Sequence, residues 1–359
     1  MILLLIISIL FIFIPIKIKT IKVSKDRNIQ SIGIWTYGKP FDLENGEEYY
    51  MDNETLQFLS SKNIYFIWGG INRNKLNTYL ISNFTNFKNL GIKLHIWISP
   101  IEKNLSFFNL WSFENLTNEI KFILSYFDNF SLIGDPITTI VYDMEGIPDA
   151  YFPLYGMNSF ILSKIKEYYE VQKKFIEFNQ WIHENYNLNI RICTDIYQAY
   201  DLIDGDSDLI SIWGLFNDYH TYTDYSFMIY RRNNMGLNYI LDSLNLIDTN
   251  STIILNSWKE KDHFCWNDLN CALNEAKLVL DYPKKQFNLE IWCLYYFLKS
   301  FKISGLIKFI NSIFSNDENY LQIEIRNQFP YSFYSDLLLI GIGYLEKFSS
   351  LFRLLYLFY

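Results

Sequence analysis

From residue 30 onward, short runs rich in Ile, Val, Tyr and Trp alternate with longer amphipathic stretches. Short apolar runs are typical of buried strands, and apolar positions three and four apart are typical of helices. Strands that alternate with helices form parallel sheets. The pattern predicts eight strands, at residues 31–36, 64–68, 93–99, 138–143, 189–194, 209–213, 252–257 and 306–311.

Helical periodicity appears between most of these runs, and Gly91 is a stop signal after the second predicted helix. Residues 226–231 are compatible with a ninth strand or with the start of a helix. Residues 290–301 favour a helix, with a strand as the alternative. The predicted helices cover residues 54–61, 73–89, 117–129, 160–186, 237–246 and 269–280.

Eight strand-helix units predict an α/β protein with a (β/α)8 barrel over residues 28–315, a length close to the roughly 250 residues of such barrels. No Pro-, Gly- or Ser-rich linker divides this region. An open doubly wound sheet is the alternative fold. The first strand, however, is not followed by the G-x-G-x-x-G spacing of dinucleotide-binding sheets.

Both ends of the chain are apolar. Residues 2–14 carry one polar residue, Ser8, so we expect residues 1–27 to be a signal peptide or membrane anchor and the protein to be secreted or membrane-anchored, outside the cytoplasm. The positive charges follow this run instead of preceding it, and a buried first strand is the alternative. Residues 316–359 predict an apolar helical extension that packs on the barrel or lies on a membrane surface.

The composition favours a folded protein and argues against a nucleic-acid-binding one. Half of the residues are hydrophobic and 19% are charged, which favours a folded protein with a large core. A formal net charge of −8 argues against nucleic-acid binding, which needs a basic surface. Among the four cysteines, Cys265 and Cys271 are the best candidates for a disulfide.

The segment TTIVYDMEG at residues 138–146 ends an apolar strand with two acids, Asp143 and Glu145. Residues two apart on a strand share a face, with Cα atoms roughly 6.6 Å apart. Two such carboxyl groups tend not to ionise together, which raises one pKa and suits a general acid. The structural alternative is a strand-end pair that solvates a turn or makes salt bridges.

Five of the nine tryptophans lie at the ends of predicted strands, where the active sites of such barrels are found. Aromatic faces around a site suit sugar rings, which have apolar faces and polar edges. Tryptophan as a large filler of the barrel is the alternative for each of them. The candidate binding residues are Trp35, Trp68, Trp97, Trp213 and Trp258, with Tyr142, Tyr197 and His95 as further possible contacts. For His95 the sequence favours a core histidine over a contact with the ligand.

With the D-x-E motif at the end of its fourth strand, the chain resembles the (β/α)8 glycoside hydrolases, especially the chitinase-like and hyaluronidase-like families. The resemblance implies that Glu145 donates a proton to the leaving glycosidic oxygen, and that Asp143 orients a substrate acetamido group or tunes Glu145. Of the chitinase pattern D-x-x-D-x-D-x-E, only these two residues match, because Thr138 and Val141 stand at the first two acidic positions.

A second hydrolase geometry pairs Glu145 with a carboxylate nucleophile, Glu260, after the seventh strand. The distance between the two carboxyl groups would then decide between retention and inversion. Met144 departs from the Asn that usually precedes the acid in this group, and Glu260 lies in a charged run typical of a solvated loop. Asp195, directly after the fifth strand, is a candidate supporting carboxylate.

The four histidines are scattered, and no motif for a metal, a nucleotide or a catalytic serine is present, so we expect no cofactor and no metal. The sequence thus predicts a glycoside hydrolase that acts on a polysaccharide or glycoconjugate. The alternatives are a catalytically inactive glycan-binding barrel tethered to a membrane, and a structural membrane-associated protein.

Overall fold

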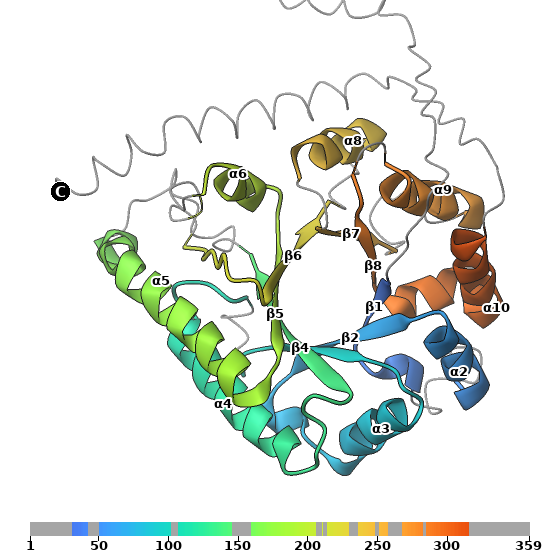
Figure 1. Cartoon of the computed structure of the whole chain (residues 1–359), viewed down its shortest axis with the longest axis horizontal. Coiled ribbons are helices and arrows are strands. Elements are labelled where there is room, and N and C mark those ends of the chain that lie inside the picture. Colours follow the sequence, from blue (N-terminus) through green and yellow to red (C-terminus); the bar gives the residue numbers. More distant parts are fainter. Residues whose placement is uncertain are drawn as a thin grey trace, which may run out of the picture.

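A computed structural model describes most of residues 31–315. The described residues are 31–41, 50–101, 107–145, 159–205, 210, 214–229, 236–247, 251–257, 268–282 and 285–315. Their eight parallel strands form a closed barrel in sequence order, and helices surround it (Figure 1). The predicted (β/α)8 barrel is therefore confirmed.

Each strand pairs in parallel with the next, and β8 pairs with β1 to close the barrel. Most strand residues are buried, because the helices cover the outside and side chains fill the inside, which explains the apolar runs of the sequence. The strands are β1 (Ile32–Thr36), β2 (Ile64–Ile71), β3 (Leu94–Ile98), β4 (Ile137–Met144), β5 (Asn189–Thr194), β6 (Thr223–Met228), β7 (Thr252–Asn256) and β8 (Asn288–Trp292).

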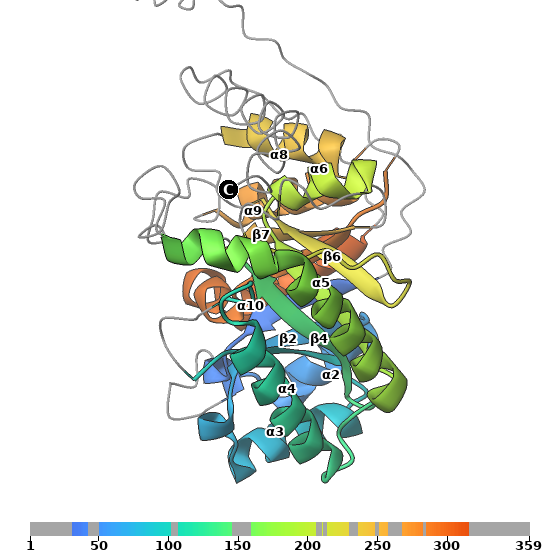
Figure 2. The ribbon, with the colours of Figure 1, turned by 90° about the vertical axis from the view of Figure 1, so that its left-hand side faces the viewer.

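All six predicted helices are present, but the one predicted at residues 73–89 begins at Thr78 and the one predicted at residues 117–129 begins at Phe113. The side chains of Asp52 and Asn77 accept hydrogen bonds from the first turns of α2 and α3, and Gly91 has the positive φ of 68° that ends α3. Helix α5 runs along the outside of the barrel (Figure 2). The α-helices are α2 (Asn53–Ser61), α3 (Thr78–Asn89), α4 (Phe113–Asp128), α5 (Ser159–Tyr186), α6 (Tyr197–Asp204), α8 (Gly236–Leu246), α9 (Leu269–Leu280) and α10 (Leu294–Phe314), with 3-10 turns η1 (Lys39–Phe41) and η4 (Arg73–Lys75).

Two predicted strands are wrong. The sixth strand is Thr223–Met228 instead of residues 209–213, of which only Ile210 is described, with helical backbone. The eighth strand is Asn288–Trp292, and residues 306–311 belong to helix α10. The buried positions of that helix after residue 305 are three or four apart, a helical period that outweighs the apolar character of the run. They are Leu306, Phe309, Ile310 and Ile313.

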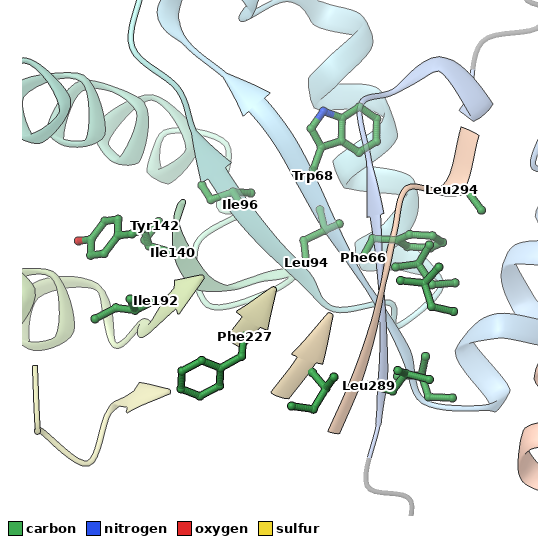
Figure 3. Packing of buried hydrophobic residues seen from close by; sticks show 14 of the residues in the cluster. Phe66, Trp68, Leu94, Ile96, Ile140, Tyr142, Ile192, Phe227, Leu289 and Leu294 are labelled. Carbon is green, nitrogen blue, oxygen red and sulfur yellow. The ribbon is translucent and has the colours of Figure 1, made fainter. Parts of the chain in front are cut away.

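The side chains of each strand alternate between two apolar layers. The outer layer packs against the helices, and Figure 3 shows part of it, including Phe66, Leu94 and Ile192. The inner layer fills the barrel. It contains Trp35, Tyr65, Ile67, Val141, Cys193, Met228 and Ile254, with Trp97 and Trp292 packed against them.

The predicted leader at 1–27 and the predicted extension at 316–359 lie outside the described residues. Among the described helices, none is both long and apolar enough to cross a membrane. Cys271 is disulfide-bonded and its predicted partner Cys265 is outside the described residues, whereas Cys193 and Cys293 are free and buried.

Candidate functional site

Four aromatic rings gather toward the carboxyl end of the barrel interior, and we call them the aromatic cluster: Trp35, Tyr37, Trp97 and Trp292. The ring centroids of Trp35 and Trp292 are 4.8 Å apart, and that of Tyr37 lies 5.9 Å from Trp97 and 5.5 Å from Trp292. Tyr37 is 39% exposed, whereas Trp35 is fully buried. The cluster therefore runs from the barrel core to the solvent.

A glycine gives the rings of this cluster room to approach the backbone of β2. A Cβ at Gly69 would lie 2.7 Å from a ring carbon of Trp97 and 2.8 Å from one of Tyr37, closer than such atoms can pack. Any larger residue at position 69 would push these two rings away.

Three carboxyl groups meet on the neighbouring arc of the barrel, at the ends of β4 and β5: Asp143, Glu145 and Asp195. The parallel register pairs Met144 with Thr194, and continuing it by one residue places Glu145 opposite Asp195. Neighbouring strands are about 4.8 Å apart. We call these residues the carboxyl cluster. The structure brings together three of the four predicted acids, and the fourth, Glu260, lies outside the described residues.

Asp143 holds its proton to higher pH than an ordinary aspartate. It is only 4% exposed, and its pKa is raised well above 3.8, chiefly by burial and further by the negative charges of Glu145 and Asp195. Its Oδ1 has no hydrogen-bond partner among the described residues. A carboxyl pKa is therefore raised at the D-x-E pair, but the group affected is Asp143 and burial is the larger cause.

Glu145 is the better placed of the two to touch a ligand. It follows the last residue of β4 and is partly exposed, whereas Asp143 lies two residues deeper on the same face. A neutral, buried Asp143 can donate a hydrogen bond, and it adds no negative charge beside Glu145.

Trp97 links the carboxyl cluster to the aromatic cluster. It pairs in register with Val141, one inward-facing position below Asp143 on β4. The carboxyl end of the barrel therefore has an aromatic arc on β8, β1 and β3 and an acidic arc on β4 and β5. A ring with apolar faces and polar edges would meet both kinds of surface there.

Two predicted binding residues face the other way. Trp68 packs in the outer layer, stacked 5.2 Å from Phe41, and Tyr142 donates a hydrogen bond of 2.8 Å to Asn179 of helix α5. Figure 3 shows both side chains among the outer-layer residues. The expectation that they contribute to the site was wrong, because each lies at an odd number of residues from an inward-facing neighbour, Ile67 and Val141.

His95 faces inward but lies deeper than the aromatic cluster. Its ring stacks on Tyr65 with centroids 4.2 Å apart, and burial, with Arg191 and Lys93 nearby, lowers its pKa well below 6.5. It is a neutral core histidine, the alternative that its sequence context allowed. Trp213, Trp258 and Glu260 lie outside the described residues, as does the side chain of Tyr197.

Sequence reasoning missed two members of the aromatic cluster, Tyr37 and Trp292. Trp292 lies in the segment 290–301, where the sequence favours a helix, and the alternative strand over the same residues puts Trp292 near its start, whereas the structure ends β8 at Trp292. Tyr37 follows β1 by one residue and shares the inward face of Trp35. The two-residue alternation of strand side chains, counted from Trp35, predicts this inward direction of Tyr37.

The described residues contain no group of three or more His, Cys, Asp or Glu side chains suited to hold a metal ion.

No protein-family model matches the chain, and no curated protein matches it. Solved structures with a similar fold include a D-tagatose 3-epimerase-like protein, with a TM-score of 0.42 and 10% identity over 79% of this chain and 97% of that one. A xylanase and α-amylase inhibitor protein, solved in complex with trehalose, has a TM-score of 0.43 and 11% identity over 80% of this chain and 98% of that one. A β-mannanase from Streptomyces thermolilacinus has a TM-score of 0.36 and 8% identity over 77% of this chain and 85% of that one. At these scores the similarities carry no argument about this chain's activity.

Proposed function

We propose that the protein is a glycoside hydrolase that acts on a polysaccharide or glycoconjugate, with Glu145 as the general acid. The observation that carries this proposal is the carboxyl cluster beside Trp97, where a partly exposed Glu145 stands next to a buried Asp143 whose pKa is raised. Glycosidic bonds are cleaved by pairs of carboxyl groups at such strand ends.

In this proposal a sugar ring packs on the aromatic cluster, and its glycosidic oxygen points toward the carboxyl cluster. A protonated Glu145 gives its proton to the leaving oxygen as the bond from that oxygen to the anomeric carbon breaks. A water molecule then adds to the anomeric carbon and gives up its proton to a carboxylate of the carboxyl cluster. Asp143 is a positioning residue, because its proton can stabilise the Glu145 carboxylate left after the transfer. Asp195 would stabilise the positive charge that develops on the ring, or Glu260 would serve as the second carboxylate.

The decisive experiment compares Glu145→Gln with the wild type in reducing-sugar release from a panel of polysaccharides. Glutamine keeps the shape of the side chain but cannot donate the proton, so we expect a loss of about 10²-fold or more in turnover with sugar binding retained. Glu177→Gln on helix α5 is the matched control, because Glu177 is 60% exposed and forms a surface ion pair with Lys173.

Two outcomes would overturn the proposal. Equal turnover by wild type and Glu145→Gln would remove Glu145 from the acid role. Binding of a glycan by both proteins, without cleavage of any substrate, would identify a glycan-binding barrel instead of a hydrolase.

We also propose that the protein works outside the cytoplasm. Cys271 is disulfide-bonded, and disulfides persist mainly in oxidising compartments. The apolar run at residues 2–14 supports export. Fractionation of the cells that make the protein tests this proposal, and recovery of the folded chain in the cytosolic fraction with four free thiols would overturn it.

A further inference from the structure

A buried carboxylate lies beneath the aromatic cluster. Glu290 of β8 is fully buried, two residues before Trp292 on the same inward face. Its Oε1 accepts hydrogen bonds from the Tyr65 hydroxyl at 2.8 Å and from Arg191 at 2.5 Å, and its Oε2 accepts one from the Trp35 indole N–H at 2.8 Å. We call Glu290, Arg191, Tyr65 and Trp35 the Glu290 network.

The network connects strands on opposite sides of the barrel, since its members come from β1, β2, β5 and β8. Arg191 also donates to the Tyr65 hydroxyl at 2.8 Å. Burial disfavours the charged guanidinium, but Tyr65, Glu290 and Asp224 together raise the pKa of Arg191, so the guanidinium stays charged. Every oxygen of the Glu290 carboxylate has a fixed donor.

The backbone is built to admit this network. A Cβ at Gly33 would lie 2.5 Å from ring carbons of Tyr65 and 2.7 Å from Cγ of Glu290. Glycine in the interior of a strand weakens it and often marks a place where another group approaches closely. In β1 this glycine is Gly33, which pairs with both Tyr65 and Glu290 in the barrel register.

Stability alone does not account for the network. Apolar residues that replace a buried ion pair are often neutral or stabilising, because both charges lose their hydration on burial. The network instead fixes the orientation of the Trp35 ring, because the indole has one N–H donor and Glu290 accepts its hydrogen bond. Trp35 in turn contacts Trp292, with centroids 4.8 Å apart, and Trp97, at 6.1 Å.

We propose that Glu290 is a positioning residue for ligand binding: its carboxylate fixes the orientation of the Trp35 ring, and Trp35 sets the spacing of Trp97 and Trp292. The ligand class in this inference, a sugar ring stacked on the aromatic cluster, rests on the proposed function. The orientation of Trp35 does not depend on it.

Glutamine cannot replace Glu290 in this role. If its amide oxygen faces Arg191 and Tyr65, its NH₂ group faces the indole N–H of Trp35, and two donors oppose each other. If the amide is turned, its NH₂ group faces the guanidinium. Either way Trp35 or Arg191 loses its acceptor, and the ring moves.

The test uses near-UV and exciton circular dichroism of the tryptophans, with Trp181→Phe on helix α5 as the control that removes an indole away from the cluster. We expect Glu290→Gln to change the tryptophan bands. We also expect a weakening of about tenfold in the binding of cellohexaose, chitohexaose, mannohexaose or xylohexaose, whichever the wild type binds, with KM affected more than kcat. In a Trp35→Phe background, Glu290→Gln should have little further effect on either quantity.

A second variant, Arg191→Met with Glu290→Met and Tyr65→Phe, separates positioning from packing, because it fills the same space with apolar groups. We expect it to fold with altered tryptophan bands and weakened binding. Wild-type bands and wild-type affinity in this variant, or additive effects of Glu290→Gln and Trp35→Phe, would overturn the positioning role. Absence of binding by the wild type to all four oligosaccharides would overturn the proposed function, while the dichroism would still decide the role of Glu290.

Discussion

Asp143 lies opposite Cys193 in the parallel register of β4 and β5, and both side chains are buried inside the barrel. Burial raises the pKa of the Cys193 thiol well above 9.0, and the nearby carboxyl groups, Asp143 first among them, raise it further. The pKa of Asp143 is raised by burial in the same way. Burial in this part of the barrel therefore disfavours a negative charge on either side chain.

Asp143→Asn should make the fold more stable than the wild type at neutral pH. Above its ordinary pKa of 3.8, the unfolded chain loses the proton of Asp143 while the folded chain keeps it, so the wild-type free energy of unfolding falls as pH rises until the raised folded pKa is reached. The limiting slope is about 1.4 kcal/mol per pH unit. Urea unfolding of both proteins between pH 4 and 8 measures the difference.

The sign of that difference is the test. The stability of Asp143→Asn relative to wild type should rise with pH above about 4 and vanish below it. Asp128→Asn is the control, because Asp128 is exposed at the end of helix α4. A pH-independent difference for Asp143→Asn would show that Asp143 ionises normally in the folded chain.

The cysteines should differ in reactivity. Cys193 and Cys293 are free but buried, and a thiol reacts as its thiolate, so the native protein should react very slowly with 5,5′-dithiobis(2-nitrobenzoate) at pH 7.5. In denaturant without reductant we expect two reactive thiols per chain, and after reduction four, because Cys271 is disulfide-bonded. Four thiols in the unreduced denatured chain would contradict the disulfide.

Trp97 and Trp68 provide a matched pair of substitutions. Trp97 belongs to the aromatic cluster, so Trp97→Ala should weaken sugar binding more than it weakens the fold. Trp68 packs among Phe41, Phe84 and Phe87 in the outer layer, so Trp68→Ala should cost about 3–5 kcal/mol of stability. Thermal unfolding should show the larger loss of stability for Trp68→Ala, and oligosaccharide titration should show the larger loss of affinity for Trp97→Ala. If one variant showed the larger loss in both measurements, the assigned faces would be contradicted.

The barrel could be predicted from the sequence because strands buried on both faces read as continuous apolar runs. The two wrong strands have identifiable causes. Strand β6 begins with the polar residues Thr223 and Asp224, and β8 carries the charged Glu290 in its centre, so neither resembles a core strand. In β8 the charge faces into the barrel, where Arg191 and Tyr65 come from distant strands that no local pattern reveals.

The acids of the candidate site were predictable for a different reason. Asp143 and Glu145 interrupt an apolar strand at its carboxyl end, where this fold gathers its functional groups. The direction of the aromatic side chains could not be predicted, because a shift of one residue moves a ring from the inner layer to the outer one. Trp68 and Tyr142 lie on that other face.

Gly33→Ala should destabilise the barrel by about 1–3 kcal/mol, because the new methyl group would overlap two side chains that have no room to move. Its Cβ would lie 2.5 Å from the Tyr65 ring and 2.7 Å from Cγ of Glu290. Tyr65→Leu removes the ring atoms that the methyl group would meet, so the double variant should lose less stability than the sum of the two single ones. Urea unfolding of the four proteins measures this coupling. Additive losses would show that Gly33 does not make room for Tyr65, and an unchanged midpoint for Gly33→Ala would show that the inner layer is loose enough to admit a methyl group.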